Sequence, residues 1–184
     1  MKNIELASID QIDLIMKIIK ACTNHMIKNG IFQWNDKYPT KQSFIDDINN
    51  EDLFVLKYED KIIGCVCASF EMDDFYKQIT WDTSSKKNIY LHRLAIHPDH
   101  QGQGFAKYIM KFIENFAKES GCLSVRLDTF SQNKKNNHLY SKLGYKKLGK
   151  IYFRDQSDMP FNCYEKPLKS VSYTHLTLPT KRIV

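Results

Sequence analysis

The chain begins with a segment whose hydrophobic residues repeat every three or four positions, as one face of a helix requires. These residues are Ile12, Ile15, Met16, Ile19 and Cys22. Ser8 or Asp10 can cap the start of this helix, and Asn29-Gly30 ends it. An aromatic, turn-rich stretch over 30–39 separates it from a shorter helix, which the pattern predicts over 40–49.

Strand-like runs rich in Val, Ile, Phe and Cys come next. Including one ahead of the first helix, strands are predicted at 3–6, 53–58, 61–70 and 89–96. The second and third of these are joined across Glu59-Asp60 and form a hairpin. A polar segment, 71–88, leads to the fourth strand. His92 is expected to share a face of that strand with Tyr90 and Leu94, because side chains alternate along a strand.

Helices and strands alternate in the second half of the chain. The remaining elements are predicted as a helix at 104–120, a strand at 123–127, a helix at 134–143, and strands at 145–153 and 162–168. The apolar stripe of the longer helix consists of Phe105, Ile109, Phe112 and Phe116. This order predicts an α/β fold: a mixed, mostly antiparallel sheet with helices on both faces and one parallel βαβ crossover, formed by 89–96, 104–120 and 123–127.

Composition describes one ordinary domain, with 184 residues of which 42% are hydrophobic and 26% charged. A chain of this length can hold a core without disulfides or a structural metal. It has no apolar run long enough to span a membrane and no signal sequence, so we expect a cytoplasmic protein without membrane contact. The five cysteines are odd in number and include no CxxC pair, so they are interpreted as small apolar residues, and no metal site is expected.

The last segment, 170–184, differs from the rest because it shows neither helical nor strand periodicity. We expect the folded domain to be 1–169 and the segment 170–184 to be a non-native or disordered tail. The net charge of +6 includes Lys181 and Arg182, which leaves +4 for the domain. So small an excess argues against nucleic acid as a partner.

The strand at 89–96 continues through a glycine-rich turn into the start of a helix. Helix N-termini bind anions, and Gly102 and Gly104 remove side chains that would keep phosphate oxygens away. The turn therefore predicts a phosphorylated cofactor. A dinucleotide fingerprint, with Asp128 as the ribose-binding acid, fails because Lys107 stands where that motif needs a third small residue and too little chain follows Asp128.

Two motifs in this half resemble those of a known family. Gln101-Gly102-Gln103-Gly104-Phe105-Ala106 matches the signature (Q/R)-x-x-G-x-(G/A). The segment 133–145 (NKKNNHLYSKLGY) is similar to N-(x6)-Y-x3-G-(F/Y). Both occur in the GNAT superfamily of acyl-CoA N-acyltransferases, and the order of elements agrees with that family from 3 to 168. The resemblance implies a GNAT-like fold and transfer of an acetyl group from acetyl-CoA to a primary amine by direct attack.

The resemblance also implies which residues bind acetyl-CoA. The diphosphate would lie against the glycine loop, with a lysine beside it, and the pantetheine arm and thioester oxygen against backbone groups of the preceding strand. The residues so assigned are Leu94, Ala95, Ile96, Gln101, Gly102, Gln103, Gly104, Phe105, Ala106, Lys107 and Asn133.

For the chemistry, the resemblance implies that Tyr140 is the acid that protonates the leaving thiolate. Tyr140 follows Asn133 by about two helical turns, so both can address one face. The base that takes a proton from the amine stays open between two residues. His92 has an imidazole that titrates near neutral pH, and Glu71, at the end of the preceding strand, can act directly or through water.

The amine that accepts the acetyl group must be bound by residues outside the two motifs. Phe32, Trp34 and Tyr38 are expected to form one wall of its pocket, and Tyr152 with Phe153 another. Three aspartates are interpreted as a solvated loop rather than as a cation site: Asp73, Asp74 and Asp82. The acceptor is a small-molecule or protein amine. The alternative function is a non-catalytic acyl-CoA-binding module, and a homodimer is compatible with the sequence, which does not determine the oligomeric state.

Overall fold

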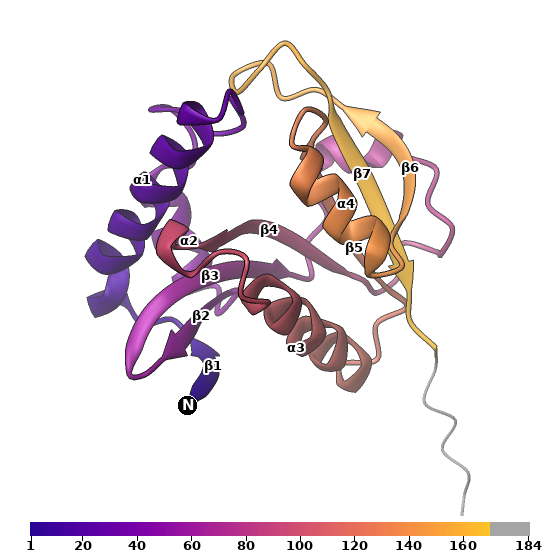
Figure 1. Cartoon of the computed structure of the whole chain (residues 1–184). Coiled ribbons are helices and arrows are strands. Elements are labelled where there is room, and N and C mark those ends of the chain that lie inside the picture. The colour runs from indigo at the N-terminus through magenta and orange to yellow at the C-terminus, as the bar shows by residue number, and fades with distance from the viewer. Residues whose placement is uncertain (170–184) are drawn as a thin grey trace, which may run out of the picture.

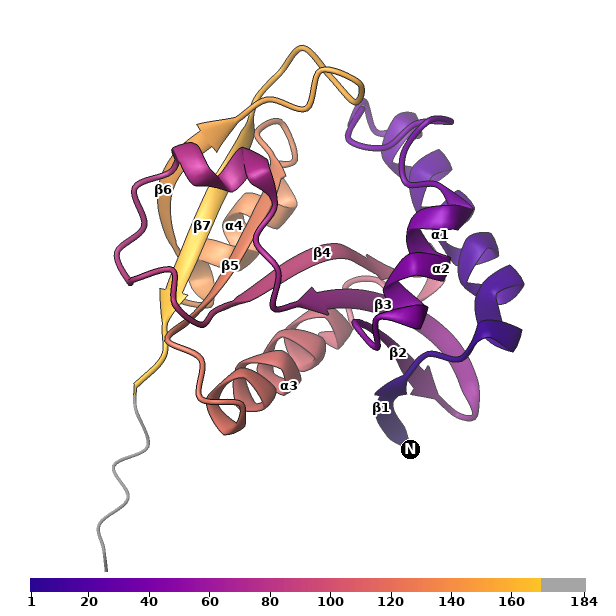
Figure 2. The same cartoon turned by 180° about the vertical axis from the view of Figure 1, so that it is seen from behind.

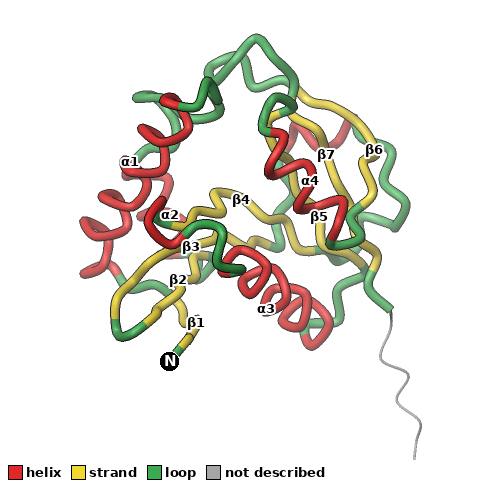
Figure 3. Tube along the Cα trace, viewed as in Figure 1, coloured by secondary structure: helices red, strands yellow, loops and turns green. Residues whose placement is uncertain are grey.

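The structure, a computed structural model, describes residues 1–169, and the predicted tail at 170–184 lies outside the described residues. The strands are β1 (Lys2–Leu6), β2 (Leu53–Tyr58), β3 (Lys61–Ser69), β4 (Ile89–Ile96), β5 (Ser124–Phe130), β6 (Lys146–Ile151) and β7 (Phe161–Pro167). The helices are α1 (Ile12–Lys28), α2 (Lys41–Asn49), α3 (Phe105–Glu119) and α4 (Lys134–Lys142), with short 3-10 turns that include η2 (Asp74–Gln78). Figure 3 shows these elements by type. Their order confirms the one predicted from the sequence.

The seven strands form one sheet in the order β1-β2-β3-β4-β5-β7-β6. Every neighbouring pair is antiparallel except β4 and β5, which are parallel and joined through α3, so the predicted crossover is confirmed. The pairing of β4 with β5 covers only 89–91 and 125–127, and beyond it the two strands diverge (Figure 1). This divergence leaves the far half of β4 with an unpaired edge toward β5.

Helices cover both faces of the sheet, as predicted. One face packs against α3 and α4 through a core that contains Ile109, Ile113 and Tyr140. The other face packs against α1 and α2, where Ile15 and Phe44 are fully buried. Figure 2, seen from behind, shows η2 on the face of β5 and β7 that is opposite to α4. All five cysteines are free and buried, which confirms their interpretation as core residues.

A bulge interrupts β4 and corrects one prediction. Arg93 and Leu94 together stand opposite Val66 of β3, and Arg93 takes a positive φ of 53° to allow it. The bulge reverses the alternation of side chains beyond it. His92 lies before the bulge and shares a face with Tyr90, as expected, because both pack against Tyr76. Leu94 lies beyond it and therefore packs into the opposite core beside α3.

No helix within residues 1–169 is long and apolar enough to cross a membrane.

Candidate active site

Two cavities meet where β4 and β5 diverge. The larger, about 650 Å³, lies along the glycine loop and is called the loop cavity. The smaller, about 440 Å³, lies on the side of α2 and η2 and is called the acidic cavity. Both volumes fall in the range of small-molecule sites. Four residues line both cavities and so mark their junction: Gln33, Trp34, Leu94 and Asn136.

The glycine loop presents backbone groups to the loop cavity. Gly102 and Gly104 have φ values of 77° and 82°, which side-chain-bearing residues rarely adopt. Gly104 is the N-cap of α3, and it has no side chain to accept from the N–H groups of the first turn. A Cβ atom at either glycine would meet no atom within 4 Å, so the space before the loop is open. The geometry is that of an anion site at a helix N-terminus.

The loop cavity brings together ten of the eleven residues predicted to bind the cofactor. These are Leu94, Ala95, Ile96, Gln101, Gly102, Gly104, Phe105, Ala106, Lys107 and Asn133. Gln103 does not line it, and its side chain donates instead to the carbonyl of Asp99 (3.3 Å). The Ile96 carbonyl is already engaged, because it accepts from Cys22 Sγ (3.1 Å) and from Gln101 Nε2 (2.9 Å).

The charge of the loop cavity suits a polyphosphate. Lys107, Lys135 and Lys142 line it, and within the described residues no carboxylate side chain does. Lys135 Nζ also donates to Gln101 Oε1 (3.2 Å), which ties the start of α4 to the glycine loop. Open space before backbone N–H groups, surrounded by lysines, therefore fits the diphosphate of acetyl-CoA.

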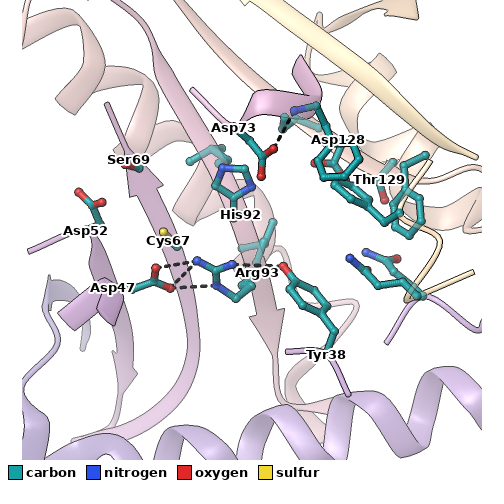
Figure 4. A pocket seen from close by; sticks show the side chains of 18 of the residues that line it. Tyr38, Asp47, Asp52, Cys67, Ser69, Asp73, His92, Arg93, Asp128 and Thr129 are labelled. Carbon is teal, nitrogen blue, oxygen red and sulfur yellow. Dashed lines mark hydrogen bonds and ion pairs between the residues drawn. The ribbon is translucent and has the colours of Figure 1, made fainter. Parts of the chain in front are cut away.

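The acidic cavity contains an ion pair in its wall. Arg93 donates to Asp47 of α2 through Nη2 (2.6 Å) and Nε (2.9 Å), and Nη1 donates to the Tyr38 hydroxyl (3.2 Å). Figure 4 shows these bonds. The bulge in β4 directs Arg93 toward α2, so the irregular backbone and the ion pair belong together. The charge of Asp47 is thereby compensated.

Asp128 of β5 is a titratable group that the sequence did not identify as a base. It lines the acidic cavity and accepts a hydrogen bond from the Tyr76 hydroxyl. Burial raises the pKa of Asp128 from 3.8 to about 6, and the nearby charge of Asp73 acts in the same direction, while the Tyr76 hydroxyl opposes them. A carboxylate with such a pKa is a suitable proton acceptor near neutral pH. The available signal was an acidic residue late in a strand, directly after the apolar Leu127.

Tyr140 of α4 also lines the acidic cavity and is only 5% exposed. Burial raises the pKa of its hydroxyl well above the ordinary value, so the group stays protonated at neutral pH. None of the hydrogen bonds formed within 1–169 involves this hydroxyl. Its proton is therefore available to a group bound in the cavity.

His92 and Glu71, the two bases considered from the sequence, lie in the same cavity. Burial, and then the positive charge of Arg93, lower the pKa of His92 from 6.5 to about 3. The imidazole is therefore neutral, and it is a weaker base than the Asp128 carboxylate. Glu71 is exposed, just after the end of β3.

The predicted acceptor wall is only partly present. Trp34 is 5% exposed and lines both cavities, and Tyr38 and Phe153 line the acidic cavity. Phe32 and Tyr152 are 58% and 51% exposed and line neither cavity, so the structure does not bring them to the site.

The three aspartates considered as a solvated loop separate in the structure. Asp74 pairs with Lys77 and Asp82 with Lys146 at the surface. Asp73 alone of the three lines the acidic cavity.

A buried ion pair holds the segment between β3 and β4 that forms part of this cavity. Arg126 and Glu165 are both fully buried, with Nε 3.0 Å from Oε1. Arg126 Nη2 donates to the Thr83 carbonyl (2.7 Å), and Glu165 accepts from the backbone N–H of Asp82 (2.6 Å). Trp81 covers the guanidinium at 4.5 Å from its ring centre. The pair therefore fixes this segment at its base.

Known proteins resemble this chain in sequence. The pattern that describes the acetyltransferase (GNAT) family matches residues 15–145. The chain is 33% identical over 100 residues to N-acetyltransferase 8B of Homo sapiens, which covers 54% of this chain and 40% of that relative. It is 35% identical over 68 residues to thialysine N-epsilon-acetyltransferase of Sus scrofa, covering 37% of this chain and 40% of that relative. The matched part thus spans about 40% of the length of these curated relatives.

Solved structures resemble the fold over nearly its whole length. A GNAT-family acetyltransferase from Streptococcus agalactiae superposes with a TM-score of 0.80 and 26% identity, covering 92% of this chain and 96% of that one. An N-acetyltransferase from Thermoplasma acidophilum, solved in complex with coenzyme A, superposes with a TM-score of 0.68 and 18% identity, covering 91% of this chain and 99% of that one. The second likeness shows the fold alone.

Proposed function

The chain belongs to the acetyltransferase (GNAT) family, and from this premise we propose that it transfers an acetyl group from acetyl-CoA to a primary amine by direct attack. One observation carries the proposal: the loop cavity, suited to a polyphosphate, meets the acidic cavity, which holds Tyr140 and Asp128, at the divergence of β4 and β5. A thioester that enters from one side can there meet an amine that enters from the other.

The loop cavity is proposed to bind acetyl-CoA, which supplies an acetyl group activated as a thioester. Backbone N–H groups of 102–106 hold the diphosphate, with Lys107 and Lys135 as charge partners. The unpaired edge of β4 at Leu94 and Ala95 offers backbone groups to the pantetheine arm and to the thioester oxygen. Trp34 and Gln33 line the passage toward the acidic cavity, and Asn133, in the loop cavity, donates to Gln33 Oε1 (3.1 Å).

Proton transfer is assigned to two side chains of the acidic cavity, Asp128 and Tyr140. Asp128, oriented by the Tyr76 hydroxyl, takes a proton from the acceptor ammonium, so that a neutral amine attacks the thioester carbon. Tyr140 donates its proton to the sulfur as the carbon–sulfur bond breaks, and the attacking nitrogen returns a proton to Tyr140 through water as it becomes the neutral amide. Asp128 then releases its proton to solvent. His92 and Glu71 remain competing bases, ranked lower because of the low pKa of His92 and the exposure of Glu71.

A thiol-release assay tests this function. The full chain is mixed with acetyl-CoA and a panel of amines that contains a polyamine, an aminoglycoside, an amino acid, an arylalkylamine and a peptide with a free N-terminus. Release of thiol that depends on the amine, and that Tyr140→Phe reduces at least tenfold, supports the proposal. Binding of CoA without thiol release from any amine favours the alternative, a non-catalytic acyl-CoA-binding module.

A further inference from the structure

The acidic cavity carries more negative charge than its own residues compensate. Its single lining cation within 1–169 is Arg93, which is paired with Asp47. The remaining lining carboxylates are Asp52, Glu71, Asp73 and Asp128. None of the salt bridges formed by the described residues involves any of these four. Unpaired charges in a partly enclosed site favour a bound group of opposite charge.

These four carboxylates lie at two ends of the cavity. Asp128 is on β5, and Asp73 lies near enough for its charge to raise the pKa of Asp128. Asp52 precedes β2, and besides the larger effect of burial the charges of Asp47 and Glu71 raise its pKa, so these carboxylates lie near it. Strands β3 and β4 stand between β2 and β5, and Figure 4 places Asp52 and Asp128 on opposite sides of His92 and Arg93. At about 4.8 Å per strand, the backbones that carry them are roughly 14 Å apart.

Two further features of the cavity point to a bound ligand. The Tyr140 side chain is only 5% exposed, yet its hydroxyl is not among the buried polar atoms that lack a partner, so within 1–169 it opens onto the cavity without a hydrogen bond, and a polar group of a ligand can bond to it there. Apolar side chains lie among the charges, with Phe75, Phe153 and Phe161 in the lining. They can contact a hydrocarbon segment that joins two polar ends.

We propose that the acceptor is a dicationic alkyl amine, whose reacting amino group lies at Asp128 and whose second ammonium group lies at Asp52. The proposal rests on the proposed acetyl transfer and specifies its substrate class. The bonds made and broken are those of that transfer. The second ammonium takes no part in the chemistry and contributes only binding.

The test compares diamines with monoamines of equal chain length. Thiol release by the full chain is measured for diaminobutane, diaminohexane and diaminooctane, each beside the corresponding monoamine. For at least one length, we expect kcat/KM to be about tenfold to hundredfold higher for the diamine, the range typical of a charge-assisted contact. Equal kcat/KM values at every length would overturn the dication proposal and leave acetyl transfer intact.

The variant Asp52→Asn should remove this preference. It is expected to raise KM for the preferred diamine about tenfold while kcat/KM for the monoamine stays unchanged. Asp74→Asn, the same change at an exposed aspartate that does not line the cavity, should alter neither value. An equal loss for monoamine and diamine in Asp52→Asn would assign Asp52 a structural role and refute its place in recognition.

Calorimetry separates this proposal from the transfer reaction itself. Binding of the preferred diamine and of its monoamine is measured with the CoA-loaded protein, for the wild type and for Asp52→Asn. Tighter binding of the diamine that Asp52→Asn abolishes supports the second cation site even if no thiol is released. Equal binding of the two amines refutes it, whatever the result for acetyl transfer.

Discussion

Asp128→Asn tests whether a carboxylate is kept in the acidic cavity at the expense of stability. The pKa of Asp128 rises from 3.8 to about 6 on folding, chiefly through burial. Between these values the folded chain holds a proton that the unfolded chain has released, so the stability of the protein falls as the pH rises through this window and stays low above it. An asparagine amide has no such ionisation.

The expected magnitude follows from that difference in pKa. Since a tenfold change in an equilibrium is about 1.4 kcal/mol, ionised Asp128 costs the fold at most about 3 kcal/mol at pH 7.5 and about 1 kcal/mol at pH 4.5. These values are upper bounds because the carboxylate faces a cavity open to water. Asp128→Asn should therefore be more stable than the wild type at pH 7.5, by up to about 6 to 12 °C in melting temperature, and by less at pH 4.5.

Activity should change in the opposite direction. Loss of the base is expected to lower kcat/KM at least a hundredfold, and the wild type should lose activity below a pH of about 6 as Asp128 becomes protonated. Urea unfolding at the two pH values and a pH profile of thiol release provide the measurements. A variant no more stable than the wild type at pH 7.5 would refute the raised pKa. Undiminished turnover would return the role of base to His92 or Glu71.

Three other substitutions test the remaining assignments. Tyr140→Phe should lower kcat at least tenfold and leave the Kd for CoA unchanged, whereas an equal loss of CoA affinity would show a binding role. Gly104→Ala places an alanine where the backbone φ is 82° and should raise the Kd for CoA about tenfold in calorimetry. The control Gly121→Ala makes the same change at a φ of 73°, at the other end of α3, and should leave the Kd for CoA unchanged. Arg126→Met leaves Glu165 buried without its partner and should lower the free energy of unfolding by about 3–5 kcal/mol, measured in urea; a loss below about 1 kcal/mol would contradict the role of this ion pair in fixing the segment between β3 and β4.

The order of the elements was predictable because it depends on local patterns. Periodicity identifies each helix and strand, and the chain between 89 and 127 leaves room for only one crossover. The glycine loop was also predictable, because glycine adopts positive φ values without steric cost, and Gly102 and Gly104 do so here. Ten of the eleven residues expected near the cofactor accordingly line one cavity.

The acceptor side was less predictable because its properties arise between distant segments. The pKa of Asp128 depends on its burial and on Tyr76, which lies 52 positions earlier in the chain. The bulge at Arg93 is a property of the pairing of β4 with β3, and strict alternation therefore assigned Leu94 to the wrong face. Phe32 lies in a turn-rich stretch, where no period shows which way an aromatic side chain points. Tyr152 was included in the strand predicted at 145–153, but β6 ends at Ile151.

The bulge in β4 connects the two halves of the site through one irregular residue. Its positive φ directs Arg93 toward Asp47 in the wall of the acidic cavity, and the shift that follows places Leu94 at the junction of both cavities. A regular strand would turn Leu94 toward the face of His92 and the side chain of residue 93 away from α2. The positive φ of Arg93 is a strained conformation, and only this conformation brings its guanidinium to Asp47. The ion pair with Asp47 therefore stabilises the strained backbone.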